Sequence, residues 1–271
     1  MFSALFVMIT QEKSIYIIRG LLMNLGKPIK NGNTAKIYLY NGKIIKIFND
    51  NLPDTESEYE ANKQKYAYSC GLPVPYIYEV TKINNKQAII MEYISGRTIG
   101  DIIYDNMAKA EEYMNLSVDV QLKIHAVKTK NLELMTDKLN RQIRSARLID
   151  DKQKKGLLEK MWAIKYENHL CHGDYHVFNL ILEDKDITII DWVDASAGDI
   201  RADVYRSYLL YSQFSMDLAN LYLRLYCKKS GISQSDIFIW ASIIAGARLS
   251  ENVSDEKANF LVDIVKQYCP L

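Results

Sequence analysis

The sequence lacks the features that mark disulfide-rich, zinc-binding, membrane-spanning, nucleic-acid-binding and P-loop proteins. Its four cysteines lie far apart and form no Cys-x-x-Cys pair, which argues against a disulfide framework or a zinc site and favours a reducing, cytoplasmic setting. No apolar run approaches the length of a membrane-spanning helix, so no membrane is expected as a partner. With 34 basic and 33 acidic residues, the chain has no overall field that would draw it to nucleic acid. A Walker A phosphate-binding loop is absent as well, which excludes the P-loop class.

Residues 1–22 are expected to form a leader of uncertain structure. Met1–Thr10 is apolar, but it has no basic segment ahead of it and no small-residue cleavage site, so a signal peptide is not favoured. An extra strand, an extra helix and a disordered leader remain open. Met23 is an alternative start, because the recognisable pattern begins just after it.

Residues 23–95 predict a small, mainly β unit. Two runs rich in β-branched and aromatic residues, at 36–40 and 43–48, are joined by Asn41-Gly42. An Asn-Gly pair between two such runs is the strongest short signal for a hairpin. The remaining elements of this unit are predicted as a helix at 55–70 and strands at 77–80 and 87–93.

Residues 96–271 predict a larger, mainly helical unit. The pattern is helical and free of proline from about 101 to 167, and it is mostly helical again after residue 200. Two short apolar runs between them, at 180–182 and 187–190, predict a second hairpin. The predicted fold class is therefore α+β, with a β-rich N-terminal unit and a helical C-terminal unit.

The candidate catalytic and metal-binding residues lie in the segment between the two helical regions. Asp174 is a carboxylate in a glycine-containing loop, Asn179 lies five residues later, and Asp191 follows an apolar run expected to be a buried strand. A carboxylate at the end of such a strand would be held rigidly, as a metal ligand should be. Carboxylate and amide oxygens suit Mg²⁺. Phosphoryl transfer needs a metal, a base beside the attacking hydroxyl and accurate positioning, and this segment offers those parts.

The His-Gly-Asp run that ends at Asp174, the Asn179 after it and the Ile-Asp-Trp run around Asp191 resemble the catalytic segment of the aminoglycoside phosphotransferase and choline kinase superfamily. That superfamily has a bilobal, protein-kinase-like fold. The resemblance implies that Asp174 is the catalytic base that orients the acceptor hydroxyl, and that Asn179 and Asp191 hold Mg²⁺. It covers roughly residues 25–210.

The N-terminal half carries the matching nucleotide residues. Lys46 resembles the strand lysine that pairs the α- and β-phosphates, and Glu60 resembles its ion-pair partner, with Glu56 one helical turn away as the alternative. At the expected hinge, the resemblance implies that adenine bonds to the Glu92 carbonyl and the Ile94 amide.

Several other residues receive structural interpretations. Asp199 and Asp203 are expected to hold the catalytic loop by hydrogen bonds, His172 to be a structural hydrogen bonder, and Asp194 to be a solvated or loop-capping carboxylate. A further set shares helical spacing and predicts a half-buried aromatic core, with a cage for a quaternary ammonium as the alternative: Tyr205, Tyr208 and Tyr211.

The resemblance implies a kinase that uses ATP or GTP to phosphorylate a hydroxyl of a small molecule, with an aminoglycoside as the acceptor of many relatives. A choline, amino-alcohol or sugar kinase is the alternative within the superfamily. A nucleotide-binding pseudokinase that regulates a partner is the alternative outside it, and the intact set of Lys46, Asp174, Asn179 and Asp191 argues against it. A protein kinase is disfavoured because nothing resembles an activation segment.

The numbers of charged residues in the two helical regions bear on the charge of the acceptor. Residues 97–168 hold fourteen basic and eleven acidic side chains, and residues 207–271 hold six of each. Polycationic acceptors need an acidic lining, and neither helical region is acidic overall. Glu251 belongs to a local acidic cluster near the C-terminus, which could serve a smaller cation or simply be a solvated helix face, the commoner case. The counts predict an acceptor with fewer positive charges than a typical aminoglycoside, bound with help from aromatic side chains.

Overall fold

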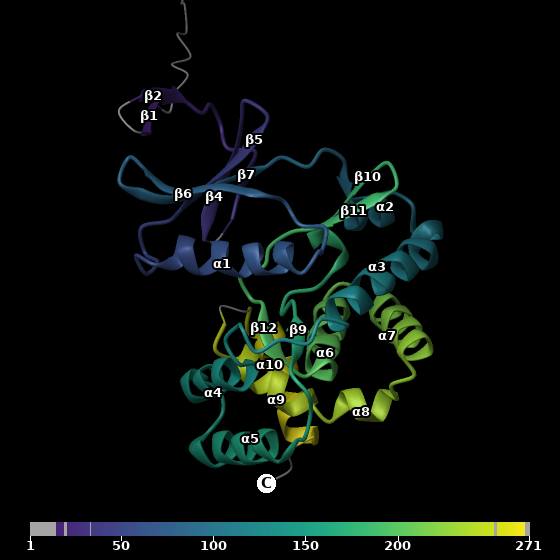
Figure 1. Cartoon of the computed structure of the whole chain (residues 1–271). Coiled ribbons are helices and arrows are strands. Elements are labelled where there is room, and N and C mark those ends of the chain that lie inside the picture. The colour runs from purple at the N-terminus through teal and green to yellow at the C-terminus, as the bar shows by residue number, and fades with distance from the viewer. Residues whose placement is uncertain (1–14, 19–20, 33, 252–253, 269–271) are drawn as a thin grey trace, which may run out of the picture. The chain divides into compact units, whose positions relative to one another are not determined.

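The computed structural model describes residues 15–18, 21–32, 34–251 and 254–268. These residues form two compact units (Figure 1). The first comprises residues up to Lys65 together with Pro75–Tyr93, and the second comprises Tyr66–Val74 together with the chain from Ile94 onward. Most of the predicted leader, residues 1–14 and 19–20, lies outside the described residues.

The first unit is built on a five-stranded antiparallel sheet in the order β3-β4-β5-β7-β6. A separate hairpin, β1–β2, contains the described part of the predicted leader. The elements of the unit are β1 (Ile15–Ile18), β2 (Leu21–Asn24), β3 (Lys30–Asn31), β4 (Ala35–Tyr40), β5 (Lys43–Phe48), α1 (Glu56–Ser69, whose last turn belongs to the second unit), β6 (Ile77–Ile83) and β7 (Lys86–Glu92).

Side chains alternate between the two faces of the sheet along β5. Ile45 and Ile47 belong to the apolar core on one face. Phe48 packs with Ala61 of α1 in the core on the other face. Because residues two apart point the same way, Lys46 shares the face of Phe48, which is the face that α1 covers.

The turn between β4 and β5 has the backbone that an Asn-Gly pair favours. Asn41 has φ 48° and Gly42 has φ 70°, so both central residues are left-handed, as a two-residue hairpin turn requires. The hairpin predicted here is confirmed, and its register pairs Ile37 with Lys46.

The second unit is mainly helical, as the sequence predicts, and carries two small antiparallel sheets, β11-β10-β8 and β12-β9. Its elements are β8 (Arg97–Thr98), α2 (Ile99–Asp105), η1 (Met107–Lys109), α3 (Ala110–His125), α4 (Met135–Ser145), α5 (Asp151–Ala163), β9 (His169–Cys171), η2 (Val177–Asn179), β10 (Leu180–Glu183), β11 (Asp186–Ile189), β12 (Ser196–Gly198), α6 (Ile200–Ser212), α7 (Met216–Ser230), α8 (Gln234–Phe238), α9 (Ala241–Arg248) and α10 (Asp255–Tyr268).

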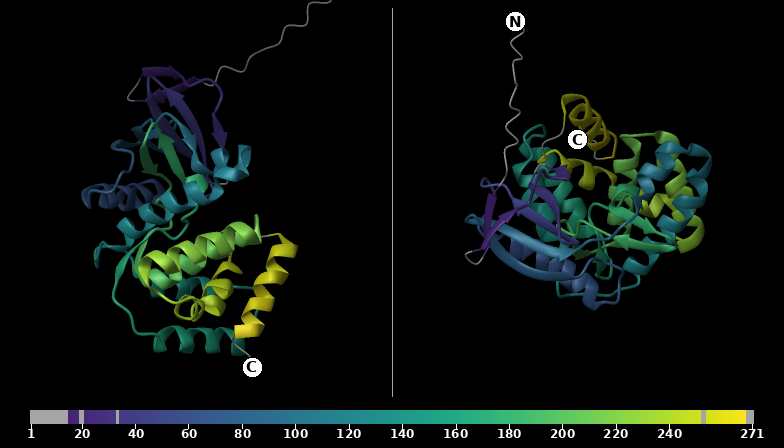
Figure 2. Two further views of the ribbon diagram at one scale, coloured as in Figure 1. Left: turned by 90° about the vertical axis from the view of Figure 1, so that its right-hand side faces the viewer. Right: turned by 90° about the horizontal axis from the view of Figure 1, so that it is seen from above.

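One apolar core holds the helices of the second unit together. Trp192 and Trp240 are fully buried in it. Tyr205 and Tyr211 are buried too, and Tyr208 packs against Phe238, so these tyrosines form the predicted aromatic core. Within this unit, α5 lies far from the β10–β11 hairpin (Figures 1 and 2). None of the described helices is long and apolar enough to cross a membrane.

Local chemistry sets the ends of several helices. Asp150 caps α5 through a reciprocal pair of bonds with Gln153, in which each side chain accepts from the other residue's backbone amide. Asp199 caps α6 by accepting from the Arg201 amide. Gly231, with φ 75°, ends α7 in the left-handed conformation common after helices.

The backbone geometry of the Asn41-Gly42 turn, which precedes Lys46, can be tested by substitution. Gly42→Ala should lower the free energy of unfolding by about 1 kcal/mol, because an L-residue is strained at positive φ. Asn41→Gly is the matched control and should change stability little, since glycine adopts the same φ without strain. Urea denaturation followed by circular dichroism measures both. An Ala variant as stable as the parent would mean that this turn has another geometry.

Candidate active site

Asp174 lies on a loop whose backbone requires glycine at position 173. Gly173 has φ 81°, and a Cβ atom placed there would lie 2.3 Å from the carbonyl oxygen of Asp194. The loop leaves β9, which pairs with β12, and runs into the short helix η2. Its path is therefore fixed by a close approach of backbone to backbone just before Asp174.

The buried carboxylate of Asp203 anchors this loop. Its Oδ1 accepts from the Gly173 amide at 2.7 Å, and its Oδ2 accepts from the His172 amide at 3.3 Å. The Nε2 of His125 lies 3.0 Å from Oδ2. Burial opposes ionisation, but the hydrogen bond and charge of His125 and the Gly173 amide hold the pKa of Asp203 below its usual value. The expectation that Asp203 holds the loop is thus met.

Asp199 does not share that role, contrary to expectation. Its carboxylate accepts from the Arg201 side chain and, at 2.9 Å, from the Trp240 indole. It therefore fixes the start of α6 against the helical core instead of the loop.

His172 is a structural hydrogen bonder, as predicted. It is fully buried; its Nε2 lies 3.1 Å from the Ile190 carbonyl oxygen, and its Nδ1 lies 3.3 Å from the Asp174 amide nitrogen. One neutral tautomer satisfies both contacts, with Nε2 donating and Nδ1 accepting. Burial lowers the pKa of His172, which favours that neutral form.

Asp174 is surrounded by donors. Asn179 Nδ2 donates to its backbone oxygen at 2.9 Å and approaches its Oδ2 at 3.3 Å. His176 Nε2 lies 3.5 Å from Oδ2, and Arg206 Nη2 lies 4.0 Å from Oδ1. Burial would raise the pKa of Asp174, but the His176 hydrogen bond and the nearby positive charges hold it well below its usual value. The side chain is therefore a carboxylate at neutral pH.

Asn179 and Asp191 are brought together through the backbone. The Ile190 amide donates to the Asn179 carbonyl oxygen at 2.9 Å, so Asp191 follows directly after that bond. The strand ends at Ile189, one residue before the end of the predicted run, and Asp191 is exposed with φ 67°. A left-handed aspartate is uncommon and marks a backbone that its surroundings hold in place. The described residues contain no cluster of three or more His, Cys, Asp or Glu that could hold a metal.

Lys46 and Glu60 form a buried ion pair within the first unit. Lys46 Nζ lies 2.6 and 2.7 Å from the two carboxylate oxygens of Glu60, and the side chains are 11% and 3% exposed. The pair forms because β5 presents Lys46 to the face covered by α1. The structure thus pairs Lys46 with Glu60, the partner preferred to Glu56.

The two residues expected to contact adenine belong to different units, Glu92 to the first and Ile94 to the second. Glu92 is the last residue of β7, and its side chain accepts from the Tyr76 amide at 3.0 Å. Ile94 is half-buried and lies outside any helix or strand. Their predicted contact with adenine stays a prediction.

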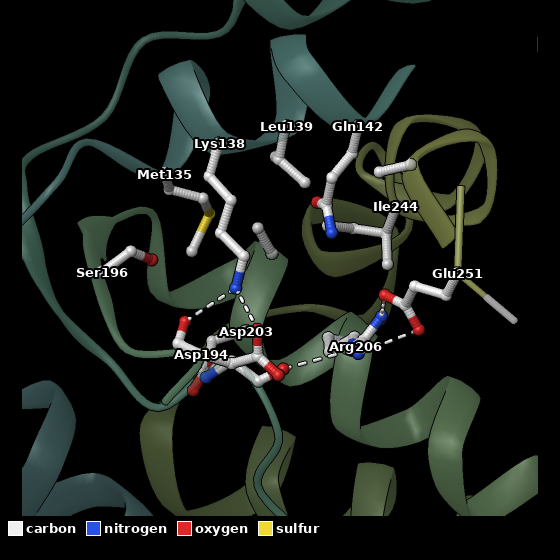
Figure 3. A pocket seen from close by; sticks show the side chains of 13 residues that line it. Met135, Lys138, Leu139, Gln142, Asp194, Ser196, Asp203, Arg206, Ile244 and Glu251 are labelled. Atoms are coloured by element: carbon white, nitrogen blue, oxygen red, sulfur yellow. Dashed lines mark hydrogen bonds and ion pairs between the residues drawn. The ribbon is translucent and has the colours of Figure 1, made fainter. Parts of the chain in front are cut away.

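A small pocket of about 40 Å³ opens beside the loop, inside the second unit. Figure 3 shows Lys138 of α4 reaching toward Asp194, and Arg206 of α6 meeting Glu251. The carbonyl oxygen and carboxylate of Asp194 both accept from Lys138, so Asp194 is paired instead of simply solvated. The lining is Met135, Lys138, Leu139, Gln142, Gly173, Asp194, Ser196, Ala202, Asp203, Arg206, Ile244, Ala247 and Glu251. No aromatic side chain is among these described lining residues.

Two residues at the site were missed by sequence reasoning. Arg206 donates from Nε to the Gly173 carbonyl oxygen at 3.1 Å and faces Asp174. Its position three residues after Asp203 puts it on the same helix face, and that spacing could have identified it. Lys138 had no such signal, because its partner Asp194 lies on a distant part of the chain.

An α+β fold with an aspartate on a fixed loop, here Asp174, and a buried lysine on a strand, here Lys46, is typical of kinase-like proteins. The family model of the phosphotransferase enzyme family matches residues 26–238. The chain belongs to that phosphotransferase family.

Solved structures share the fold. An aminoglycoside phosphotransferase, APH(4)-Ia, in complex with ADP and hygromycin B, is 13% identical with a TM-score of 0.67, over 89% of this chain and 92% of the other. A choline/ethanolamine kinase family protein from Mesorhizobium loti is 13% identical with a TM-score of 0.61, over 89% and 87%. At these identities the likeness concerns the fold alone.

Curated relatives match over a shorter part of the chain. Acyl-CoA dehydrogenase family member 11 of Pongo abelii is 25% identical over 179 residues, which cover 56% of this chain and 22% of that protein. The human protein of the same name is 24% identical over 179 residues, covering 56% and 23%. The chain thus matches less than a quarter of the length of these relatives.

The contribution of Asp203 to the stability of the folded state should depend on pH, and this can be tested. Because the pKa of Asp203 is lowered in the folded state, its contribution to stability is present above the unfolded pKa of about 3.9 and is lost as the pH falls through the folded pKa. Asp203→Asn should therefore cost roughly 3 kcal/mol at pH 7, and this difference should shrink below about pH 4.

Urea denaturation of the parent and of Asp203→Asn between pH 3 and pH 7 measures the difference in their free energy of unfolding. Asp151→Asn is the control, because Asp151 is an exposed carboxylate in the first turn of α5. A difference between Asp203→Asn and the parent that grows in acid would contradict the assignment.

Proposed function

We propose that the protein is a kinase that moves the γ-phosphate of ATP or GTP to a hydroxyl of a small molecule. The observation that carries the proposal is the ionised Asp174 on a loop tied down by Asp203, beside a pocket, in a chain of the phosphotransferase family. Phosphoryl transfer depends mainly on positioning and charge stabilisation, and a fixed carboxylate beside an acceptor pocket supplies the positioning of the acceptor hydroxyl.

The proposed step uses Asp174 to orient the acceptor. The acceptor oxygen bonds to the γ-phosphorus, the bond from that phosphorus to the bridging oxygen of the nucleotide breaks, and the hydroxyl proton passes to the Asp174 carboxylate. A carboxylate with a lowered pKa is a weak base, so its main effect is to hold the hydroxyl in line, with proton transfer late. That role suits the loose transition state of most phosphoryl transfers.

Lys46 is the proposed ligand of the α- and β-phosphates, with Glu60 holding its ammonium group in place. The short, buried contact to both oxygens of Glu60 supports this role, because Lys46 then keeps one orientation. The Glu92 carbonyl and the Ile94 amide are the proposed hydrogen-bond partners of the base. ATP and GTP both remain candidate donors.

Asn179 and Asp191 are the residues that would hold Mg²⁺. They fit the ion, since one offers an amide oxygen and the other an exposed carboxylate, and their backbones are joined through Ile190. Mg²⁺ is commonly held by one or two protein carboxylates together with phosphate oxygens and waters, so a larger cluster is not needed. When bound, the ion neutralises charge on the phosphates.

The pocket beside the loop is the proposed acceptor site. Gly173 and Arg206, which flank Asp174 in the structure, are part of its wall. Its polar lining is mixed in charge, so it favours an acceptor with fewer positive charges than a typical aminoglycoside. Choline, amino-alcohol and sugar acceptors remain within the proposed class.

Asp174→Asn tests the proposed base. The variant should keep its fold and nucleotide affinity and lose turnover by roughly 10²–10⁴-fold, the usual contribution of general-base assistance. The assay is ADP release with a panel of aminoglycosides, choline, amino alcohols, sugars and nucleosides. Retention of more than about a third of the parent's kcat would remove Asp174 from this role. Nucleotide binding without turnover of any acceptor by the parent protein would favour the pseudokinase.

Asp191→Ala tests the proposed metal ligand. Isothermal titration of a nucleotide with and without Mg²⁺ should show a Mg²⁺-dependent gain in affinity for the parent and a much smaller gain for the variant. Asp186→Ala, at the exposed start of β11, is the control and should keep the gain. An unchanged Mg²⁺ effect in Asp191→Ala would contradict the assignment.

A further inference from the structure

Three aromatic side chains of the second unit form a row that leads outward from Asp174. His176 Nε2 lies 3.5 Å from the Asp174 carboxylate. The ring centre of Phe178 lies 6.1 Å from that of His176, and the ring centre of Phe214 lies 5.9 Å from that of Phe178. The His176 side chain is 19% exposed, Phe178 is half-buried and Phe214 is 70% exposed. This aromatic row therefore begins at the candidate base and ends at the surface.

The middle ring of the aromatic row is fixed by a close approach to α2. A Cβ atom at Gly100 would lie 2.4 Å from Cδ1 of Phe178, so the glycine leaves the space that the ring occupies. Phe178 belongs to η2 and directly precedes Asn179, whose side chain donates to the Asp174 backbone. The ring is thus held close to the loop that carries Asp174.

Tyr211 ties the turn that carries Phe214 to the same loop. The Tyr211 hydroxyl accepts from the Val177 amide at 3.0 Å, and the Tyr211 carbonyl oxygen accepts from the Phe214 amide at 2.9 Å. Tyr211 is itself buried, so the exposed Phe214 ring projects from a backbone with a fixed position. A single exposed apolar side chain is ordinary at a protein surface. This one continues a packed row that starts at the candidate catalytic carboxylate.

The charged side chains that line the described pocket, on the Arg206 side of Asp174, already have partners. Asp194 is paired with Lys138, and Glu251 is paired with Arg206 at 2.7 Å. Asp203 accepts from the two loop amides. A charged group of an acceptor placed there would lose water without gaining a counter-charge, which is unfavourable. The described lining therefore suits an uncharged acceptor.

We propose that the aromatic row binds an apolar group of the acceptor, and that the acceptor is an uncharged alcohol whose hydroxyl is joined to an aryl or alkyl group. The proposal rests on the proposed function for the word acceptor, and on the three rings for the binding surface. Asp174 Oδ2 faces His176, so a hydroxyl held by Asp174 has the aromatic row beside it. An apolar group laid on the row covers the Phe214 ring and leaves water, which is favourable in proportion to the area buried.

Paired acceptors test the class of substrate. Hydrocinnamyl alcohol and n-propanol share a three-carbon alcohol and differ in one phenyl ring. Choline and dimethylbutanol differ in charge alone, because a carbon atom replaces the choline nitrogen. In the ADP-release assay, kcat/KM should be at least about tenfold higher for hydrocinnamyl alcohol than for n-propanol. Dimethylbutanol should be used more efficiently than choline, whereas cation–π attraction to the rings would reverse that order.

Matched variants connect this preference to the aromatic row. Phe214→Ala should abolish most of the preference for hydrocinnamyl alcohol over n-propanol, mainly through a higher KM for the aryl alcohol. The exposed position of Phe214 makes unfolding of this variant unlikely to confuse the result, and circular dichroism of both variants checks it. Phe260→Ala is the control, because Phe260 is an exposed phenylalanine on α10, outside the row, and it should keep the preference.

Binding without turnover separates this inference from the proposed function. Saturation-transfer NMR gives the dissociation constant of hydrocinnamyl alcohol for the full chain saturated with Mg²⁺ and a non-hydrolysable ATP analogue. Phe214→Ala should raise that constant at least about threefold, as expected for loss of an aromatic contact, and Phe260→Ala should not.

Two results would overturn the aromatic row and leave the kinase standing: equal binding by the parent and Phe214→Ala, or preferred turnover of n-propanol or choline. Binding of hydrocinnamyl alcohol that Phe214→Ala weakens, without turnover of any acceptor, would support the row and count against the kinase. Absence of binding by the parent would overturn the row.

Discussion

The geometry of the candidate site depends on one buried carboxylate. Asp203 accepts from the amides of His172 and Gly173 and is itself held by His125, so the backbone just before Asp174 has a single path. Gly173 reinforces that path because no side chain fits between it and Asp194. A loop fixed in this way can present a carboxylate without further ordering when a ligand binds, which is the condition for effective positioning.

Charge around the loop is arranged to keep Asp174 ionised and oriented. Asn179, His176 and Arg206 all face it, and Arg206 is in turn paired with Glu251. Arg206 thus contacts both the loop that carries Asp174 and Glu251 at the wall of the pocket.

Much of this could be predicted from the sequence, for physical reasons. The Asn41-Gly42 turn and the residue patterns of the two strands are local signals. They were enough to predict the hairpin that contains Lys46. The His-Gly-Asp run located Asp174, because its residues are close in sequence. Contacts between distant segments could not be read in this way: Lys138 with Asp194, and Arg206 with Glu251, bring together residues whose spacing carries no periodic signal. The interpretation of Asp194 and Glu251 from sequence missed their partners for that reason, and Asp199 was assigned to the loop although it holds Trp240.

The central claim is transfer of a phosphoryl group to a hydroxyl, and ³¹P NMR of a reaction with Mg²⁺, nucleotide and acceptor follows it directly. The account predicts a new phosphomonoester signal that grows in step with the nucleoside diphosphate and requires the acceptor. Nucleoside diphosphate formed with only inorganic phosphate, at a rate indifferent to every acceptor, would contradict it.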